Sequence, residues 1–129
     1  MAVNIPVISK PRIVIIGAGF AGIELAKALC HADVQVVLID QNNHHTFQPL
    51  LYQVSTAGLE PDSIAYPVRE IFRDQKNFIF RMARVLEVKP EENSVKTSIG
   101  DIRYDFLVIA TGANPNFFGM KDLEATRCA

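Results

Sequence analysis

The chain has 129 residues, a length that suits one domain with its own hydrophobic core and is short for two. Hydrophobic residues make up 49% of it, which is within the normal range of globular proteins, so nothing in the composition indicates disorder. The formal net charge is −1 and the 13 basic residues are scattered, so the composition argues against a nucleic-acid partner. No apolar segment approaches the roughly 20 residues that span a bilayer, and residues 1–10 lack a signal-peptide core, so we expect a cytoplasmic protein.

The first pattern along the chain joins a strand, a glycine-rich turn and a helix. Residues 12–16 predict a strand, and residues 17–22 read GAGFAG, a GxGxxG sequence that leads into a helical pattern. A second apolar run, residues 34–39, ends in Asp40. The spacing between the last glycine and this acidic residue is close to the roughly 20 positions of a dinucleotide-binding βαβ unit.

Each part of this pattern meets a chemical need. Gly17 allows the tight turn, Gly19 lets the backbone approach a pyrophosphate, and Gly22 lets the helix lie close to the sheet. Asp40 can accept hydrogen bonds from ribose hydroxyls, and its charge would repel the 2′-phosphate of an NADP-type ligand. The alternative is a glycine-rich turn without a ligand, but the agreement of strand, helix and acidic residue favours a dinucleotide site.

The βαβ pattern ends after Asp40. Residues 41–58 mix amides, imidazoles and aromatic rings in a long segment, which is typical of a functional or partly helical connection. Residues 60–63 resemble a helix start, and Pro67 predicts the beginning of a second short helix.

The last third of the chain has the two-residue period of strands. The run at residues 104–110 is nearly continuous in apolar residues, as in a strand buried on both faces of a parallel sheet, and it stops at Thr111-Gly112. The preceding elements that we expect are strands at 77–82 and 85–88, a turn at 90–93, a return strand at 94–98 and a tight turn at Gly100-Asp101. The pattern predicts an α/β fold with a parallel sheet and a β-meander.

Cysteine and histidine residues offer no redox pair and no metal site. Cys30 and Cys128 form neither a CxxC nor a CxxxxC pattern, and we expect Cys30 to be a small buried residue of the first helix. His31 follows that helix, where an imidazole interacts favourably with its carbonyl end. His44 and His45 are adjacent, so they point in different directions, and no third ligand lies nearby.

These features together resemble the FAD-binding portion of the two-dinucleotide-binding-domain flavoproteins. Within that superfamily, NHHTFQPLLYQV at residues 43–54 and LEPDSIAYPVR at residues 59–69 resemble the type II NADH dehydrogenases, the single-subunit NADH:quinone oxidoreductases. The resemblance covers about residues 11–119 and implies a Rossmann-like FAD/NAD(P)-binding fold. The disulfide reductases of this superfamily carry a CxxxxC pair after the second strand, and this chain has no thiol there, which excludes a dithiol relay.

The resemblance also implies where FAD binds. The glycine-rich loop holds the diphosphate, the acidic residue and its two followers edge the ribose and adenine, the FQP segment approaches the flavin, and the ATG turn passes beside the cofactor. Phe47 fits an ordinary core aromatic as well, and we assign no catalytic residue. The implied cofactor-binding residues are Gly17, Gly19, Phe20, Ala21, Gly22, Asp40, Gln41, Asn42, Phe47, Gln48, Pro49, Val85, Ala110, Thr111 and Gly112.

The implied reaction takes a hydride from NADH to FAD and then passes two electrons to a membrane quinone. This sequence contains one GxGxxG and neither a second unit for NADH nor membrane-associating C-terminal helices. We therefore expect an inactive amino-terminal piece of an enzyme that is peripheral on the cytoplasmic membrane face. Its expected parts are an N-terminal arm (residues 1–11), the FAD-binding domain (residues 12–112) and an extension towards an NADH-binding domain (residues 113–129).

Two other functions stay open. The chain could be a non-catalytic nucleotide-binding or interaction module that keeps the fold, or a relative of the sulfide:quinone reductases, which would need cysteines near the flavin. A further expectation concerns the strand of residues 105–110, which should lie beside residues 12–16. Without a neighbour on its other side it would self-associate through its apolar edge or be covered by residues 113–129.

Overall fold

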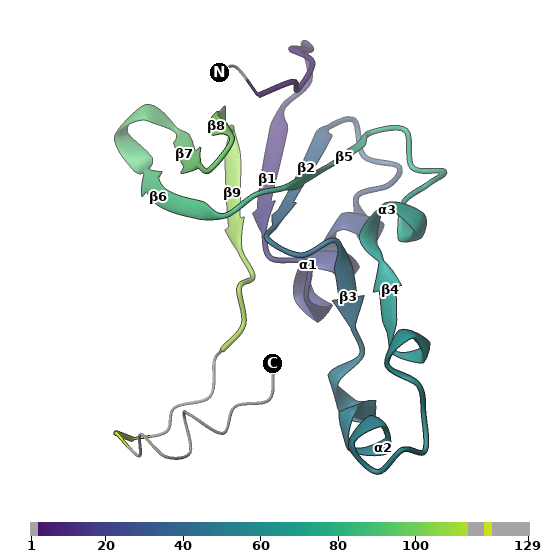
Figure 1. The fold of residues 1–129 in the computed structure, drawn as a ribbon. Coiled ribbons are helices and arrows are strands. Elements are labelled where there is room, and N and C mark those ends of the chain that lie inside the picture. Colours follow the sequence, from purple (N-terminus) through teal and green to yellow (C-terminus); the bar gives the residue numbers. More distant parts are fainter. Residues whose placement is uncertain (1–2, 114–117, 120–129) are drawn as a thin grey trace.

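A four-stranded parallel sheet forms the centre of the molecule, and its order is β5-β2-β1-β9 (Figure 1). The computed structural model describes residues 3–113 and 118–119. The strands are β1 (Arg12–Ile16), β2 (Gln35–Asp40), β5 (Phe78–Met82) and β9 (Phe106–Ile109). The predicted α/β class with a parallel sheet is confirmed.

Helices cover one face of this sheet. Helix α1 (Phe20–Ala28) and helix α3 (Val68–Ile71) pack there, and α3 begins directly after Pro67, its N-cap residue, close to where the sequence predicts a helix start. None of the described helices has the length and hydropathy to cross a bilayer. The buried cluster between sheet and helices consists of Ile15, Ala18, Ile23, Ala26, Val36, Leu38, Val68, Phe72 and Phe80.

The opposite face carries the predicted β-meander. Strands β6 (Val85–Lys89), β7 (Ser94–Thr97) and β8 (Gly100–Arg103) pair antiparallel in that order. A 3-10 helix (Pro90–Glu92) forms the turn between β6 and β7. The second buried cluster, beneath the meander, consists of Val14, Ile16, Val37, Ile39, Ala83, Val95 and Ile102. Because the two clusters lie on opposite faces, strands β1 and β2 are buried on both, which explains their unbroken apolar runs.

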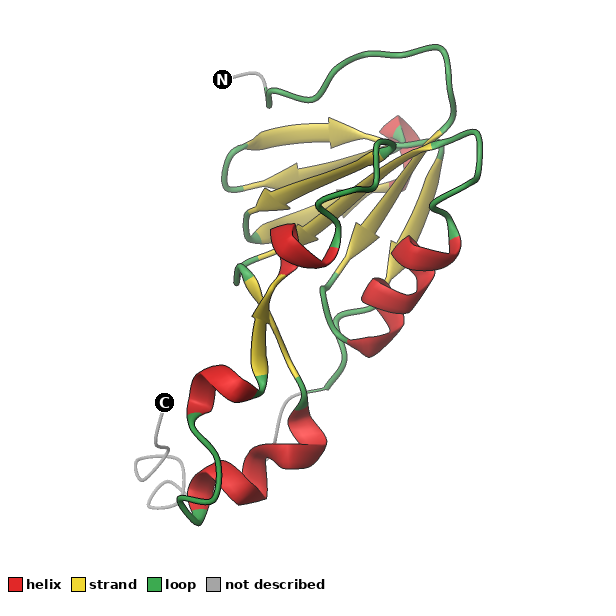
Figure 2. Ribbon diagram, turned by 90° about the vertical axis from the view of Figure 1, so that its right-hand side faces the viewer, coloured by secondary structure: helices red, strands yellow, loops and turns green. Residues whose placement is uncertain are grey.

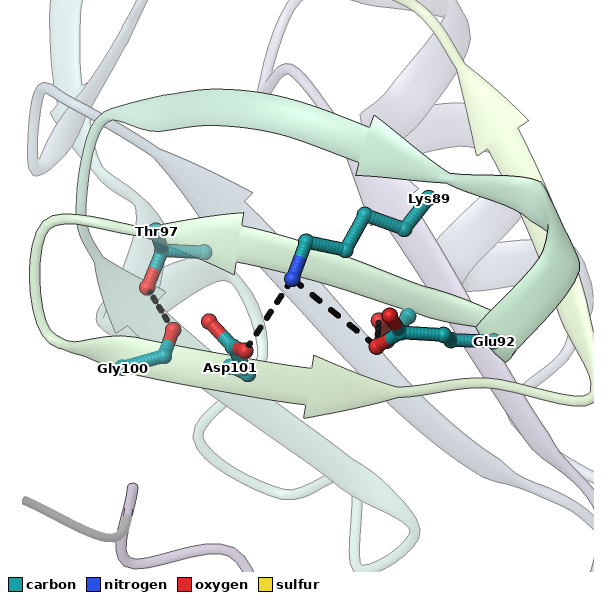
Figure 3. A network of polar contacts seen from close by, with 6 residues as sticks. Lys89, Glu92, Thr97, Gly100 and Asp101 are labelled. Atoms are coloured by element: carbon teal, nitrogen blue, oxygen red, sulfur yellow. Dashed lines mark hydrogen bonds and ion pairs between the residues drawn. The ribbon is translucent and has the colours of Figure 1, made fainter.

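Ion pairs on the meander lie at its surface. Figure 3 shows Lys89 Nζ between two carboxylates, 3.8 Å from Glu92 Oε2 and 3.9 Å from Asp101 Oδ2. Both carboxylate side chains are more than half exposed, so these pairs add little to the free energy of folding.

Residues 43–67 extend away from the sheet, and we call them the projection. Strand β3 (His44–Thr46) pairs antiparallel with β4 (Ala65–Pro67) to form its base. Figure 2 shows this two-stranded ribbon leading to short helices at its far end. These helices are two 3-10 helices (Gln48–Leu50 and Pro61–Ser63) and α2 (Leu51–Ser55), so the segment predicted to be partly helical is so.

One local prediction, the tight turn at Gly100-Asp101, is wrong because these residues belong to a strand. The turn before β8 lies at Ser98-Ile99, where Thr97 Oγ1 accepts the Ile99 N–H and donates to the Gly100 carbonyl (Figure 3). Gly100 therefore begins a strand and does not form the tight turn. The helix start expected at residues 60–63 is present as a 3-10 helix (Pro61–Ser63) with Glu60 as its N-cap, and it is only one turn long.

Strand β9 lies beside β1, as predicted, but it is not buried on both faces. Phe106 is 60% exposed and Ile109 is 64% exposed, and within the described residues β9 pairs only with β1. An edge strand has a neighbouring strand on one side only, so its side chains are more exposed than those of an interior strand. The apolar run alone does not show this difference, and the burial prediction was wrong for that reason. The expectation that residues 113–129 cover this edge concerns a segment that lies largely outside the described residues.

The end of helix α1 also differs from expectation. Cys30 is exposed, so the prediction of a small buried residue is wrong. The helix has already ended at Ala28, and Cys30 lies in the turn that follows it. The carbonyls there accept hydrogen bonds from Asn77, whose Nδ2 donates to Leu29 O and to Ala32 O. His31, which was expected to interact with this helix end, makes no hydrogen bond to it among the described residues. Cys128 lies outside the described residues.

Candidate functional site: the glycine-rich loop and its pocket

The turn between β1 and α1 is shaped by two glycines that packing requires. Gly17 has φ +106°, and its N–H donates to Ile39 O at 2.8 Å. A Cβ at Gly17 would overlap the Ala110 carbonyl, and a Cβ at Gly22 would overlap the Gly17 carbonyl. Both roles predicted from the sequence, a tight turn and a close approach of helix to sheet, agree with this geometry.

Gly19 differs from these two glycines because it faces open space. It is the N-cap of α1 with φ −78°, and a Cβ built on it would meet nothing within 4 Å. Phe20, Ala21 and Gly22 form the first turn of α1, where the backbone N–H groups have no intrahelical acceptor. This turn contains no acidic residue. The open side of the loop therefore offers backbone donors and the positive end of the helix dipole to an anion.

Asp40, at the carboxyl end of β2, is held against the loop. Its Oδ2 accepts the Ala18 N–H at 2.7 Å and its Oδ1 accepts the Asn42 N–H at 2.8 Å. An ionised carboxylate has about four acceptor positions, so each oxygen keeps one for a ligand hydroxyl. The backbone thus orients the carboxylate that the sequence assigns to a ribose.

A pocket of about 380 Å³ opens at this edge of the sheet. Five of the predicted residues line it: Gly17, Asp40, Gln41, Val85 and Thr111. The lining residues that sequence reasoning missed are Ile16, Ile39, Ala83 and Arg84. The sequence held a signal for the last two, since residues that follow a parallel strand meet those that follow its neighbour, and Ala83 N donates to Asp40 O at 2.8 Å.

The ATG turn reaches this pocket through Thr111, whereas the FQP segment belongs to the projection. Ala110 continues β9 and its N–H donates to Ile16 O at 2.8 Å, while Gly112 follows with φ +69°. Gln48 and Pro49 are exposed in the first 3-10 helix of the projection and do not line the pocket. The residues predicted to approach a flavin are thus on a separate element from those predicted to hold the adenosine.

Aromatic rings join the projection to the loop. The Phe20 ring packs edge to face with Phe47, at 5.6 Å between centroids, and with His45, at 5.1 Å. Phe47 is 43% exposed, so it is not a core aromatic.

His45 makes a second contact with the loop that sequence reasoning missed. Its Nδ1 lies 3.0 Å from the Ala18 carbonyl oxygen. The sequence analysis discussed this histidine only with respect to metal binding. Among the described residues, no group of histidine, cysteine and acidic side chains could hold a metal ion. Nothing local in the sequence connects residues 18 and 45, so this contact had no signal there.

The fold and the loop together define a dinucleotide-binding α/β domain. The chain belongs to the pyridine nucleotide-disulphide oxidoreductase family, whose model matches residues 11–129. It is 42% identical over 114 residues to the type II NADH:quinone oxidoreductase NdhA of Mycobacterium tuberculosis, and the match covers 85% of this chain and 24% of that protein. The resemblance to type II NADH dehydrogenases is confirmed.

Solved structures agree with this assignment. The sulfide:quinone oxidoreductase of Aquifex aeolicus superposes with a TM-score of 0.77 at 29% identity, covering 83% of this chain and 25% of that chain. NDH2 of Plasmodium falciparum in complex with NADH superposes with a TM-score of 0.73 at 26% identity, covering 85% and 24%. The chain spans about a quarter of the length of the curated relatives it matches.

Proposed function

We propose that this chain is the FAD-binding part of a flavin-dependent NADH:quinone oxidoreductase. The observation that carries the proposal is the pairing of Gly19, which faces open space at the start of α1, with the Asp40 carboxylate, which is bonded to the same loop. Family membership and the likeness to NDH2 support a flavin and NADH as the reactants. FAD fits this geometry because it carries both a diphosphate and an adenosine ribose.

The residues of the candidate site have separate parts in this proposal. The N–H groups of residues 19–22 bind the diphosphate, and Asp40 accepts hydrogen bonds from the adenosine ribose. Gln41, Asn42 and the Val85 backbone edge the ribose and adenine. Residues 47–49 and the turn at residues 110–112 lie along the rest of the cofactor. A bound FAD supplies the redox chemistry, hydride acceptance from NADH and electron transfer to quinone, and the protein supplies binding and orientation.

The whole protein's reaction needs groups beyond those described here. We propose that residues 12–112 form the FAD-binding domain and that quinone and membrane contacts belong to parts that the relatives have in addition. The protein would then act at the cytoplasmic membrane face.

A visible spectrum tests the cofactor directly. We expect the purified protein, incubated with FAD and desalted, to retain flavin absorption, and we expect Asp40→Ala to bind FAD less tightly in a fluorescence titration. A comparison of NADH with NADPH as electron donor would not test the role of Asp40, because in this proposal Asp40 binds the ribose of FAD and not that of the nicotinamide cofactor. A wild-type protein that folds but retains no flavin and shows no saturable FAD titration would overturn the proposal.

A sulfide:quinone reductase relative is the second candidate, because the Aquifex aeolicus enzyme superposes well. That chemistry needs thiols near the flavin. Cys30, the cysteine in the described part of the chain, is exposed and does not line the pocket at Asp40. A non-catalytic binding module is the third, and a gene sequence without a second GxGxxG downstream of codon 129 would favour it.

A further inference from the structure

Two successive peptide units of the glycine-rich loop are held by side chains from two different strands. The Ala18 N–H donates to Asp40 Oδ2 at 2.7 Å, from the end of β2. The Ala18 carbonyl oxygen lies 3.0 Å from His45 Nδ1, from β3 at the base of the projection. A carbonyl oxygen can only accept, so Nδ1 must carry the proton in this contact.

The bond to His45 sets the direction of the next N–H. In a planar trans peptide, the carbonyl oxygen of one residue and the amide hydrogen of the next point in opposite directions. Because the Ala18 carbonyl points to His45, the Gly19 N–H points away from His45. Gly19 is the residue whose missing Cβ leaves open space in front of the loop.

Glycine makes this peptide unit easy to turn over. A flip of the Ala18–Gly19 peptide would move the φ of Gly19 from −78° into the positive region, which glycine adopts at little cost. The flipped unit would present a carbonyl oxygen, with its partial negative charge, where an anionic diphosphate should bind. The residue that allows the ligand to approach therefore also leaves the loop free to adopt the wrong orientation.

We propose that His45 is a positioning residue that holds the Ala18–Gly19 peptide with its N–H towards the ligand diphosphate. The inference rests on the proposed function, since it needs a diphosphate at this loop. The edge-to-face contact of the His45 and Phe20 rings keeps the imidazole in place, and Phe20 belongs to the first turn of α1. His45 thus couples the base of the projection to the phosphate loop.

Two substitutions separate the hydrogen bond from the ring contact. His45→Phe keeps a planar ring beside Phe20 but has no N–H, whereas His45→Asn loses the ring but carries an amide N–H at the position of Nδ1. The matched control is His44→Phe, because His44 is the exposed neighbour on the same strand.

Calorimetric titration with ADP and with adenosine, and fluorescence titration with FAD, give the readouts. We expect His45→Phe to weaken FAD and ADP binding roughly tenfold, about the effect of losing one charge-assisted hydrogen bond, here from the Gly19 N–H to the diphosphate. Adenosine binding should stay unchanged. His45→Asn should stay within about threefold of the wild type, and His44→Phe should match it. A general structural defect would weaken adenosine and ADP alike.

Long-range proton–nitrogen NMR of the unmodified protein tests the geometry even if a variant does not fold. We expect the His45 proton on Nδ1. An Nδ1 without a proton, or a folded His45→Phe protein that binds ADP as tightly as the wild type, would overturn the role of His45 alone. A wild-type protein that binds neither FAD nor ADP would overturn the proposed function and this role with it.

Discussion

At the level of single residues, the three glycines of GAGFAG do different work. Gly17 and Gly22 are needed by the fold, because a side chain on either would overlap a backbone carbonyl. Gly19 has no such neighbour, so its lack of a side chain serves whatever occupies the open space. The structure thereby divides one sequence motif into a folding part and a binding part.

The first prediction uses this division. Gly19→Val should fold and lose FAD binding, because its branched carbons would occupy the space in front of the loop while its negative φ suits any residue. The loss in FAD affinity should be at least 100-fold, about 2.7 kcal/mol or more. Flavin fluorescence titration and circular dichroism measure the two effects.

Gly22→Val is the matched control for this change. Its Cβ would overlap the Gly17 carbonyl, so we expect it to lower the free energy of unfolding by about 3 kcal/mol. A folded Gly19→Val protein with wild-type FAD affinity would show that the loop does not hold the cofactor.

At the level of elements, helix α1 depends on groups far away in the sequence. It has nine residues, which is too short to be stable alone in water. Beyond its buried face, it is held at its end by a pair of amides from the segment before β5. Gln75 Nε2 donates to Ala26 O at 3.0 Å, and Asn77 Nδ2 donates to Leu29 O at 2.9 Å.

The second prediction concerns this C-terminal cap. Asn77→Ala should lower the free energy of unfolding by about 2 kcal/mol, because it removes the side-chain donor to two partly buried carbonyls, Leu29 O and Ala32 O, and the amide oxygen that accepts from Gln75 Nε2. Urea denaturation followed by circular dichroism gives the value. Lys76→Ala, an exposed neighbour, is the control and should change stability by less than about 0.5 kcal/mol. Equal stability of the two variants would mean that the amide bonds do not hold the helix end.

At the level of the whole molecule, the third prediction is that the 129-residue chain binds FAD but does not oxidise NADH with a quinone acceptor. The sequence carries one GxGxxG, which the proposed function assigns to FAD. Positioning a donor against its acceptor can lower a reaction barrier by roughly 7–11 kcal/mol. If NADH is not held against the flavin, we expect no measurable turnover. Absorbance of NADH at steady state, with and without a short-chain quinone, measures it. Steady oxidation at ordinary enzyme rates would refute the assignment of the single loop to FAD.

The fourth prediction concerns the outer edge of β9. Phe106 and Ile109 are more than half exposed on a strand that pairs only with β1 in the described residues, and such an edge is a template for pairing. We expect concentration-dependent self-association of the chain, seen by sedimentation, and we expect Ile109→Lys to reduce it. Leu86→Lys, at an exposed position of the meander, is the control. A monomer whose amides at residues 106–109 are uncovered and yet slow to exchange would contradict this prediction.

Local features of the fold and of the site could be predicted from the sequence. Residues 12–40 alone indicate β1, α1, β2, the loop and its acidic residue, because a glycine at a strained turn and an apolar run in a buried strand are local requirements. The meander and the start of α3 at Pro67 were also predicted, since turn residues and period-two runs mark them. The prediction that Cys30 is buried was wrong, because its burial depended on where the helix ends.

Contacts between distant segments had no such local signal. The bond from His45 to Ala18 follows from the direction in which the projection leaves the sheet. The approach of Ala83 and Arg84 to Asp40 can be inferred from the sequence only once the pairing of β5 with β2 is known. Likewise, an apolar run such as residues 106–109 reads alike in an interior strand and in an edge strand. Which of these it becomes depends on the strand order, because burial is a property of neighbours that the run itself does not encode.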